Sequence, residues 1–235
     1  MRVIVIKHHD IDDAGFIAAA FAARGAALQT HLVPDDGPLP ALDGADHIVV
    51  LGAVWSVYDH EHIGDWIDAE LAWLRAAGGA GIPVLGICFG AQALAAAFGG
   101  SVERAPRPEI GWLKVDSLDP GVIEPGPWLE FHFDRCIAPP GATVLATSDV
   151  CIQAFTVGGH LAVQFHPEVD GDQLRRWLDG GGAAEAERAG LDPAGLIAMS
   201  VAEEPEAARR ADRLVAAALR LASENPVAGV MTTGR

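Results

Sequence analysis

Residues 83–92 read Pro-Val-Leu-Gly-Ile-Cys-Phe-Gly-Ala-Gln. The apolar pair Val84-Leu85 predicts a short buried strand, and the alanine-rich residues 91–98 predict a helix. Cys88 falls at the sharp turn between them, which is the arrangement of a nucleophile elbow with a thiol as the nucleophile. Gly86 and Gly90 have no Cβ, so strand and helix can close around a strained central residue. The first N–H groups of the helix favour a thiolate there. The alternative is a buried structural cysteine, a common fate of free thiols.

The stretch belongs to an alternating pattern of strands and helices. Helices are predicted at Ala14–Arg24 and Glu61–Ala77, and strands at Arg2–Ile6, Leu28–Val33, His47–Leu51 and Val84–Ile87. Such alternation implies right-handed crossovers and a largely parallel sheet. After Gly99-Gly100 the strand candidates are Val102–Arg104, Gly111–Val115, Leu129–Phe133, Thr143–Thr147, Ile152–Val157 and Leu161–Phe165. They predict antiparallel additions before the sheet resumes at the last of them.

The C-terminal part of the chain has a helical pattern. A helix is predicted at Asp172–Leu178, followed by a break at Gly180–Gly182. Glu204-Pro205 then predicts the start of a second helix, which Asn225-Pro226 should end. Its apolar stripe comprises Ala207, Ala211, Leu214, Val215, Ala218, Leu219 and Ala222. We predict one α/β domain over residues 1–182 and a helical appendage over 183–235 docked on it; a stripe that faces a partner subunit is the alternative.

Composition limits the function classes. The 235 residues suffice for one domain with an appendage. The formal charge is −16, with 32 acidic and 16 basic side chains, which argues against nucleic acid and anionic membranes as partners. No apolar run reaches the roughly 18–20 residues that span a bilayer, and Met1–Lys7 reads as a first strand rather than a signal peptide. Three cysteines make a disulfide framework unexpected and favour a reducing cytoplasm.

A second motif supplies what a cysteine nucleophile needs. His166-Pro167-Glu168 comes directly after the apolar strand Leu161–Phe165. Sites in α/β sheets collect at the carboxyl ends of strands, so His166 is expected at the same rim as Cys88. His166 would act as the base and Glu168 would orient it. Taken alone, the motif could also be a solvated turn.

Together the motifs resemble those of the class I (triad) glutamine amidotransferase family. The elbow Gly86–Gln92 and His166-Pro167-Glu168 match in order, and Leu51–Asp59 lies where the family has its Gly-Gly-Pro oxyanion loop. Pro108–Trp112 resembles a segment of stand-alone members related to the GMP synthase amidotransferase domain. Glu130–Asp134 resembles the family's Trp-x-x-His-x-Asp region. The resemblance covers roughly residues 1–180 and implies a flavodoxin-like α/β fold, a mostly parallel central sheet flanked by helices.

The resemblance also implies a mechanism. Cys88 would attack a γ-glutamyl amide to form a thioester, with His166 as proton carrier and Glu168 as its partner. Backbone groups of Gly52, Ala53 and Phe89 would form the oxyanion hole, and the substrate would meet Gln92, His132, Phe133 and Asp134. No metal or cofactor is implied. A true amidotransferase would need a separate synthase to accept the ammonia, because no acceptor-activating domain fits in this chain.

Departures from the family pattern leave the substrate open. Gly52-Ala53-Val54 replaces Gly-Gly-Pro, which removes a flexible glycine and a fixed φ angle. The alternatives are a γ-glutamyl peptidase or hydrolase and, from another class, a catalytically silent regulatory or binding protein. Other features are expected to carry no chemistry: His8–Asp13 as a hydrated loop that also caps the next helix, and Cys136 and Cys151 as inert thiols with no base or partner motif.

Overall fold

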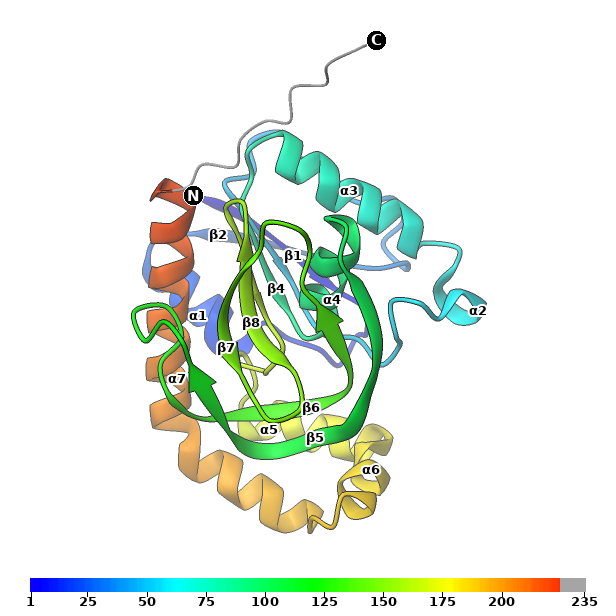
Figure 1. The fold of residues 1–235 in the computed structure, drawn as a ribbon, viewed down its shortest axis with the longest axis vertical. Coiled ribbons are helices and arrows are strands. Elements are labelled where there is room, and N and C mark those ends of the chain that lie inside the picture. Colours follow the sequence, from blue (N-terminus) through cyan, green and yellow to red (C-terminus); the bar gives the residue numbers. More distant parts are fainter. Residues whose placement is uncertain (225–235) are drawn as a thin grey trace.

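The computed structural model describes residues 1–224, which form a mixed sheet covered by helices (Figure 1). The strand order is β2-β1-β3-β4-β9-β8-β7-β5-β6. The first five strands pair in parallel: β2 (Ala27–Leu32), β1 (Arg2–Lys7), β3 (His47–Val50), β4 (Val84–Ile87) and β9 (His160–Val163). The other four pair antiparallel: β8 (Ile152–Val157), β7 (Thr143–Thr147), β5 (Ser101–Ser117) and β6 (Gly126–Ile137). The predicted fold class, with antiparallel additions, is confirmed.

Two apolar layers hold the sheet between the helices. Successive side chains of a strand point to opposite faces, so Val3 and Val5 pack on one side and Ile4 and Ile6 on the other. The first side is covered by α1 (Gly15–Ala23) and α7 (Pro193–Glu224), and the second by α3 (Ile67–Gly79) and α4 (Phe89–Ala97). Among the helices of residues 1–224, none combines the length and apolarity needed to cross a membrane.

The segment Glu61–Ala77, predicted as one continuous helix, forms two helices. The chain forms a single turn, α2 (His60–Ile63), then breaks, and α3 begins at Ile67. Gly64 weakens the helix at the break. The irregular turn lets Trp66 stack on the His8 ring, with ring centroids 5.3 Å apart. Tertiary packing of one aromatic side chain thus overrides the helical periodicity.

The two predicted strands Val102–Arg104 and Gly111–Val115 are parts of one long strand, β5. Its pairing with β6 shifts register between Arg104 and Glu109. The prolines that suggested a break, Pro106 and Pro108, lie inside this irregularity, where a missing N–H costs no ladder hydrogen bond. The predicted strand Leu129–Phe133 is the centre of β6.

Helix α5 (Gly171–Trp177) is followed by a π-helical turn (Leu178–Gly182) and then by α6 (Ala183–Arg188). Gly181 has a non-helical backbone with φ +118°, so the chain kinks there and the predicted break at Gly180–Gly182 is confirmed. The predicted start of the last helix, in contrast, is wrong. Pro205 does not open a helix but lies inside α7. The start of α7 is Pro193, where the preceding Asp192 accepts a hydrogen bond from the Gly195 N–H at 3.0 Å.

An interior proline costs about 3 kcal/mol, and the packing of α7 offsets it. The stripe residues Ala211, Leu214 and Val215 are buried in the same cluster as the α1 residues Ile17 and Phe21. The stripe therefore packs on its own chain rather than on a partner subunit. The domain boundary at residue 182 stays a prediction, and the predicted stop at Asn225-Pro226 lies outside the described residues.

A buried histidine in β3 makes the stability depend on pH. His47 is 1% exposed and neither ring nitrogen has a hydrogen-bond partner. Burial lowers its pKa to about 4. Below pH 6.5 the unfolded chain binds a proton at His47 that the folded chain does not bind, so the free energy of unfolding falls as the pH drops from 6.5 towards 4.

At pH 5 the protonation of His47 in the unfolded chain should lower the free energy of unfolding by about 2 kcal/mol, and we expect His47→Leu to remove this loss. The measurement is the urea unfolding free energy at pH 7.5 and at pH 5 for both proteins. His60→Leu, at an exposed position of α2, should keep the wild-type difference. An unchanged pH difference in His47→Leu would contradict this account.

Candidate active site

Cys88 lies at a strained turn between β4 and α4. Its backbone has φ 51° and ψ −105°, and it is the one non-glycine residue with positive φ within residues 1–224. Its N–H donates to the Val163 carbonyl at 2.8 Å, which ties the turn to β9. A Cβ at Gly86 would lie 2.5 Å from the Gly90 oxygen, and one at Gly90 would collide with the Val50 backbone. The close approach predicted for both glycines is therefore present.

His166 and Glu168 face this turn from the end of β9. The His166 N–H donates to the Leu129 carbonyl at 2.8 Å, and His166 Nδ1 lies 2.8 Å from Glu168 Oε1. Both side chains are buried, so the solvated-turn interpretation is wrong. A Cβ placed on Gly52 would lie 3.1 Å from His166 Cε1 and 3.7 Å from Cys88 Cβ. The oxyanion-loop candidate therefore lies against the nucleophile and base candidates.

The charges around His166 favour its protonated form. Burial alone would lower its pKa, but the Glu168 carboxylate and the Cys88 side chain outweigh burial and hold the pKa well above its usual range. Because Nδ1 is engaged by Glu168, Nε2 is the nitrogen left to exchange a proton with Cys88. This arrangement suits proton transfer between the Cys88 sulfur and the imidazole.

Residues 12–16 hold Glu168 and Trp177 in place beside His166. The Phe16 N–H donates to the Glu168 carbonyl at 3.0 Å, and Gly15, with φ +38°, leaves no room there for a side chain. Asp12 accepts a hydrogen bond at 2.8 Å from Trp177 Nε1, and Trp177 packs edge-on against His166 at 4.8 Å. The hydrated-loop interpretation of Asp12 is therefore wrong, since it holds an aromatic wall of the site.

A cavity of about 760 Å³ opens beside Cys88. It is lined by all four predicted substrate contacts, Gln92, His132, Phe133 and Asp134, and by Gly52, Ala53 and Phe89 of the predicted oxyanion hole. Aromatic side chains form much of its wall: Trp55, Phe131, Phe133 and Trp177. Cys88, His166 and these seven predicted residues come from four separate segments of the chain and meet around one cavity.

Asp134 is held by residues that the sequence did not identify as functional. It accepts hydrogen bonds from the Ser56 hydroxyl and, at 2.9 Å, from the Tyr58 hydroxyl. Arg104 lies 3.6 Å from Asp134 and over the Phe133 ring at 5.0 Å from its centroid. The two hydroxyl side chains follow Ala53 in the sequence, but no sequence pattern indicates that they contact Asp134 of β6, and only the fold shows it.

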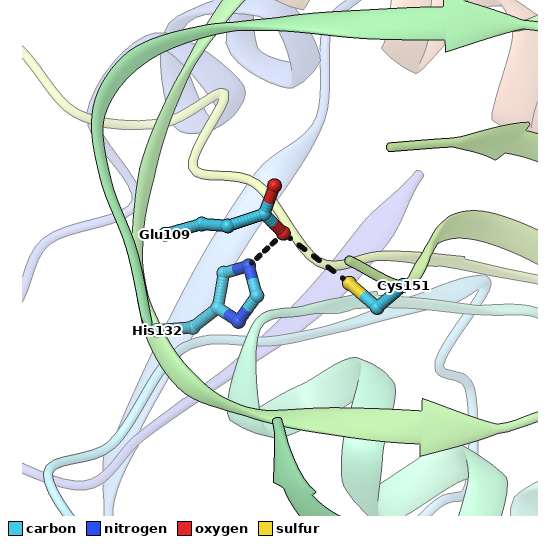
Figure 2. Close-up of side chains that lie close together, drawn as sticks. All are labelled: Glu109, His132 and Cys151. Carbon is cyan, nitrogen blue, oxygen red and sulfur yellow. Dashed lines mark hydrogen bonds and ion pairs between the residues drawn. The ribbon is translucent and has the colours of Figure 1, made fainter. Parts of the chain in front are cut away.

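Behind the cavity wall, His132 joins a buried polar cluster, shown in Figure 2. Its Nδ1 lies 2.9 Å from the Asp134 carbonyl, and its Nε2 lies 3.2 Å from Glu109 and 3.3 Å from Glu130. Burial alone would lower the pKa of His132, but the two carboxylates raise it to about 10. These carboxylates favour the protonated form of His132 at the cavity wall.

Glu109, His132 and Cys151 have metal-like spacing, with their ligand atoms within 4.8 Å of one another. Glu109 Oε2, however, already accepts hydrogen bonds from Ser148, Gln153 and Cys151, at 3.1, 2.9 and 3.4 Å. These donors form a hydrogen-bond network that fixes the Glu109 carboxylate, which lies 3.2 Å from His132 Nε2. Cys151 thus contacts a carboxylate that no sequence motif indicated, and burial raises its pKa, in agreement with the expected inert thiol.

Comparisons with known proteins agree with the geometry. The family model "Glutamine amidotransferase class-I" matches residues 14–178. The chain is 35% identical over 168 residues to a subunit of the glutamine-hydrolyzing GMP synthase of Thermoplasma acidophilum, covering 65% of this chain and 78% of that one. It is 37% identical over 178 residues to the glutamine-hydrolyzing GMP synthase of Aeropyrum pernix, covering 70% of this chain and 33% of that protein.

A solved structure extends the likeness past the matched segment. The crystal structure of a glutamine amidotransferase from Thermotoga maritima superposes with a TM-score of 0.84 at 27% identity, covering 94% of this chain and 98% of that one. The chain spans about a third of the Aeropyrum GMP synthase but most of the Thermoplasma protein. The resemblance predicted from the motifs is confirmed, and the chain belongs to the class I glutamine amidotransferase family.

Proposed function

We propose that this chain hydrolyses glutamine, or a related γ-glutamyl amide, through Cys88, His166 and Glu168. The observation that carries the proposal is the strained Cys88 turn facing a buried His166–Glu168 pair. The relatives named glutamine-hydrolyzing support glutamine as the substrate. An intact nucleophile and base at one cavity, with an orienting carboxylate bonded to the base, disfavour a catalytically silent binding protein.

The geometry supports two half-reactions. The Cys88 thiolate attacks the carboxamide carbon, and the carbonyl π electrons move to the oxygen, which the N–H groups of Ala53 and Phe89 would stabilise. The tetrahedral intermediate collapses, and the amide nitrogen takes the proton of His166 and leaves as ammonia. His166 then removes a proton from water, whose oxygen attacks the thioester. Glutamate departs and the Cys88 sulfur recovers the negative charge.

A separate synthase is the proposed acceptor of the ammonia. This rests on the relatives that are named as one subunit of a glutamine-hydrolyzing GMP synthase. Location in a reducing cytoplasm stays a prediction that rests on the cysteine content.

The size of the cavity favours γ-glutamyl peptides as a second substrate class. A volume of about 760 Å³ lies in the upper part of the range of 300–1,000 Å³ typical of small-molecule sites. Arg104, Trp55 and Phe133 are part of its wall and offer one cationic and two aromatic side chains to a larger substrate. Such a site suits a γ-glutamyl compound with a larger leaving group.

A substrate panel tests these proposals. The purified protein is incubated with glutamine, glutathione and simple γ-glutamyl amides, with and without cell extract, and released ammonia or amine is measured. We expect turnover of glutamine above the uncatalysed rate. Turnover of glutathione without turnover of glutamine would select the second substrate class, and no turnover under any condition would refute both.

A further inference from the structure

The Gly52–Ala53 peptide has two faces, and the fold must select one. In a trans peptide the carbonyl of Gly52 and the N–H of Ala53 point in opposite directions. Whatever holds the carbonyl therefore determines where the N–H points. Gly52 lies against Cys88 and His166, so the orientation of this peptide decides whether a hydrogen-bond donor or an acceptor faces the reacting carbon.

The loop itself does little to hold the peptide. Val54, which follows it, is 78% exposed and cannot lock the chain by packing. Neither a proline ring nor a side-chain hydrogen bond from Ala53 or Val54 restrains it. The preceding residue is anchored, since the Gly90 N–H donates to the Leu51 carbonyl at 3.2 Å. The restraint on the next carbonyl has to come from outside the loop.

That restraint is His8, at the end of β1. Its Nδ1 lies 3.1 Å from the Gly52 carbonyl oxygen. A carbonyl carries no proton, so Nδ1 must be the donor. Its Nε2 lies 3.0 and 3.2 Å from the two carboxylate oxygens of Glu70 in α3. Both side chains are fully buried.

Packing leaves the His8 ring little freedom. It stacks on Trp66, with ring centroids 5.3 Å apart, and meets Phe89 edge-on at 4.7 Å. Trp66 is brought there by the break between α2 and α3, and Phe89 is the residue after Cys88. The ring thus joins three segments that surround the turn, with one nitrogen directed at Gly52 and the other at Glu70.

We propose that His8, fixed by Glu70, is a positioning residue that holds the Gly52 carbonyl away from the reacting carbon and so turns the Ala53 N–H towards the oxyanion. The inference rests on the proposed function, since an oxyanion forms only if Cys88 attacks a carbonyl. His8 touches neither substrate nor nucleophile in this scheme. His8 acts only through the Gly52–Ala53 peptide group, and it supplies the restraint that Ala53-Val54 lacks.

Two electrophiles separate this role from a structural one. Iodoacetamide alkylates Cys88 by displacement and forms no oxyanion, whereas a chloroketone analogue of glutamine is attacked at its carbonyl and forms one. In His8→Leu, which removes the donor, we expect kcat for glutamine and the chloroketone rate to fall about 100-fold. We expect KM and the iodoacetamide rate to stay within about threefold of wild type, since neither depends on the oxyanion.

The conservative variant is His8→Asn, whose amide nitrogen can occupy the place of Nδ1. It should recover at least about tenfold in the chloroketone rate over His8→Leu. His62→Leu, at an exposed histidine of α2, is the matched control and should behave as wild type. If His8→Leu does not fold, the isosteric Glu70→Gln replaces it, and the ratio of chloroketone to iodoacetamide rates should fall at least about threefold.

An unchanged rate ratio in a folded His8→Leu or Glu70→Gln protein would overturn the inference, as would equal losses with both electrophiles. The labelling rates do not require glutamine turnover. An inactive wild-type protein whose Cys88 still discriminates the electrophiles through His8 would therefore refute the proposed function but not the positioning role.

Discussion

Replacing Cys88 with alanine should abolish release of ammonia from glutamine, a loss on the order of 10⁶-fold in kcat. The sulfur is the atom that would bond to substrate, and the cavity described around it offers no second nucleophile in the same position. Because the site is 6% exposed and alanine fills most of the same volume, the protein should remain folded. The measurement is ammonia release in single-turnover and steady-state assays, with circular dichroism to verify the fold.

The control for this variant is Cys136→Ala. Burial raises the pKa of Cys136, so its thiol stays protonated, and its sulfur lies 3.8 Å from Gln164 rather than beside His166. This variant should retain wild-type turnover and wild-type labelling by a glutamine-like electrophile. Turnover that survives in Cys88→Ala would rule out the proposed mechanism.

The second large effect is expected for Gly90→Ala. The added Cβ would lie 2.8 Å from the Val50 carbonyl carbon and 2.9 Å from Val50 Cβ, and closer still to the carbonyl oxygen. Neither backbone can move without shifting β3 or the start of α4. We expect a loss of about 3 kcal/mol in the free energy of unfolding. The displaced turn should also cost about 100-fold in kcat.

Gly79→Ala is the matched control for this change. Gly79 closes α3 and a Cβ there would meet nothing within 4 Å. The substitution should stabilise the protein by up to about 1 kcal/mol, because alanine has the higher helix propensity, and should leave turnover unchanged. Urea unfolding and ammonia release measure both variants. Equal stability of Gly90→Ala and wild type would show that the turn tolerates a side chain.

The site could be predicted because each part of it is local in the sequence. A glycine-flanked cysteine between an apolar strand and a helix, and His166 two residues before Glu168, are each contained within a few residues. Parallel strands bring their carboxyl ends to one edge, so the meeting of these motifs follows from the topology. Family resemblance then added the loop at Gly52.

The long elements were harder to predict because tertiary contacts override local signals. Pro106 and Pro108 lie in a register shift of one long strand, and Pro205 lies inside α7. The break at Gly64 depends on where Trp66 packs. At Pro205 the packing of α7 outweighs the helix propensity that the proline opposes, whereas Pro106 and Pro108 lie where the ladder hydrogen bonds are already interrupted.

The candidate catalytic residues of this protein could thus be identified from the sequence alone. Cys88, His166 and Glu168 can be identified from residue type, spacing and the glycines around them. What only the tertiary structure decided is how the site is supported: Asp12 holding Trp177, Ser56 and Tyr58 holding Asp134, and His8 holding Gly52. These pairs join residues far apart in the chain and have no common spacing, so only packing brings each donor to its acceptor.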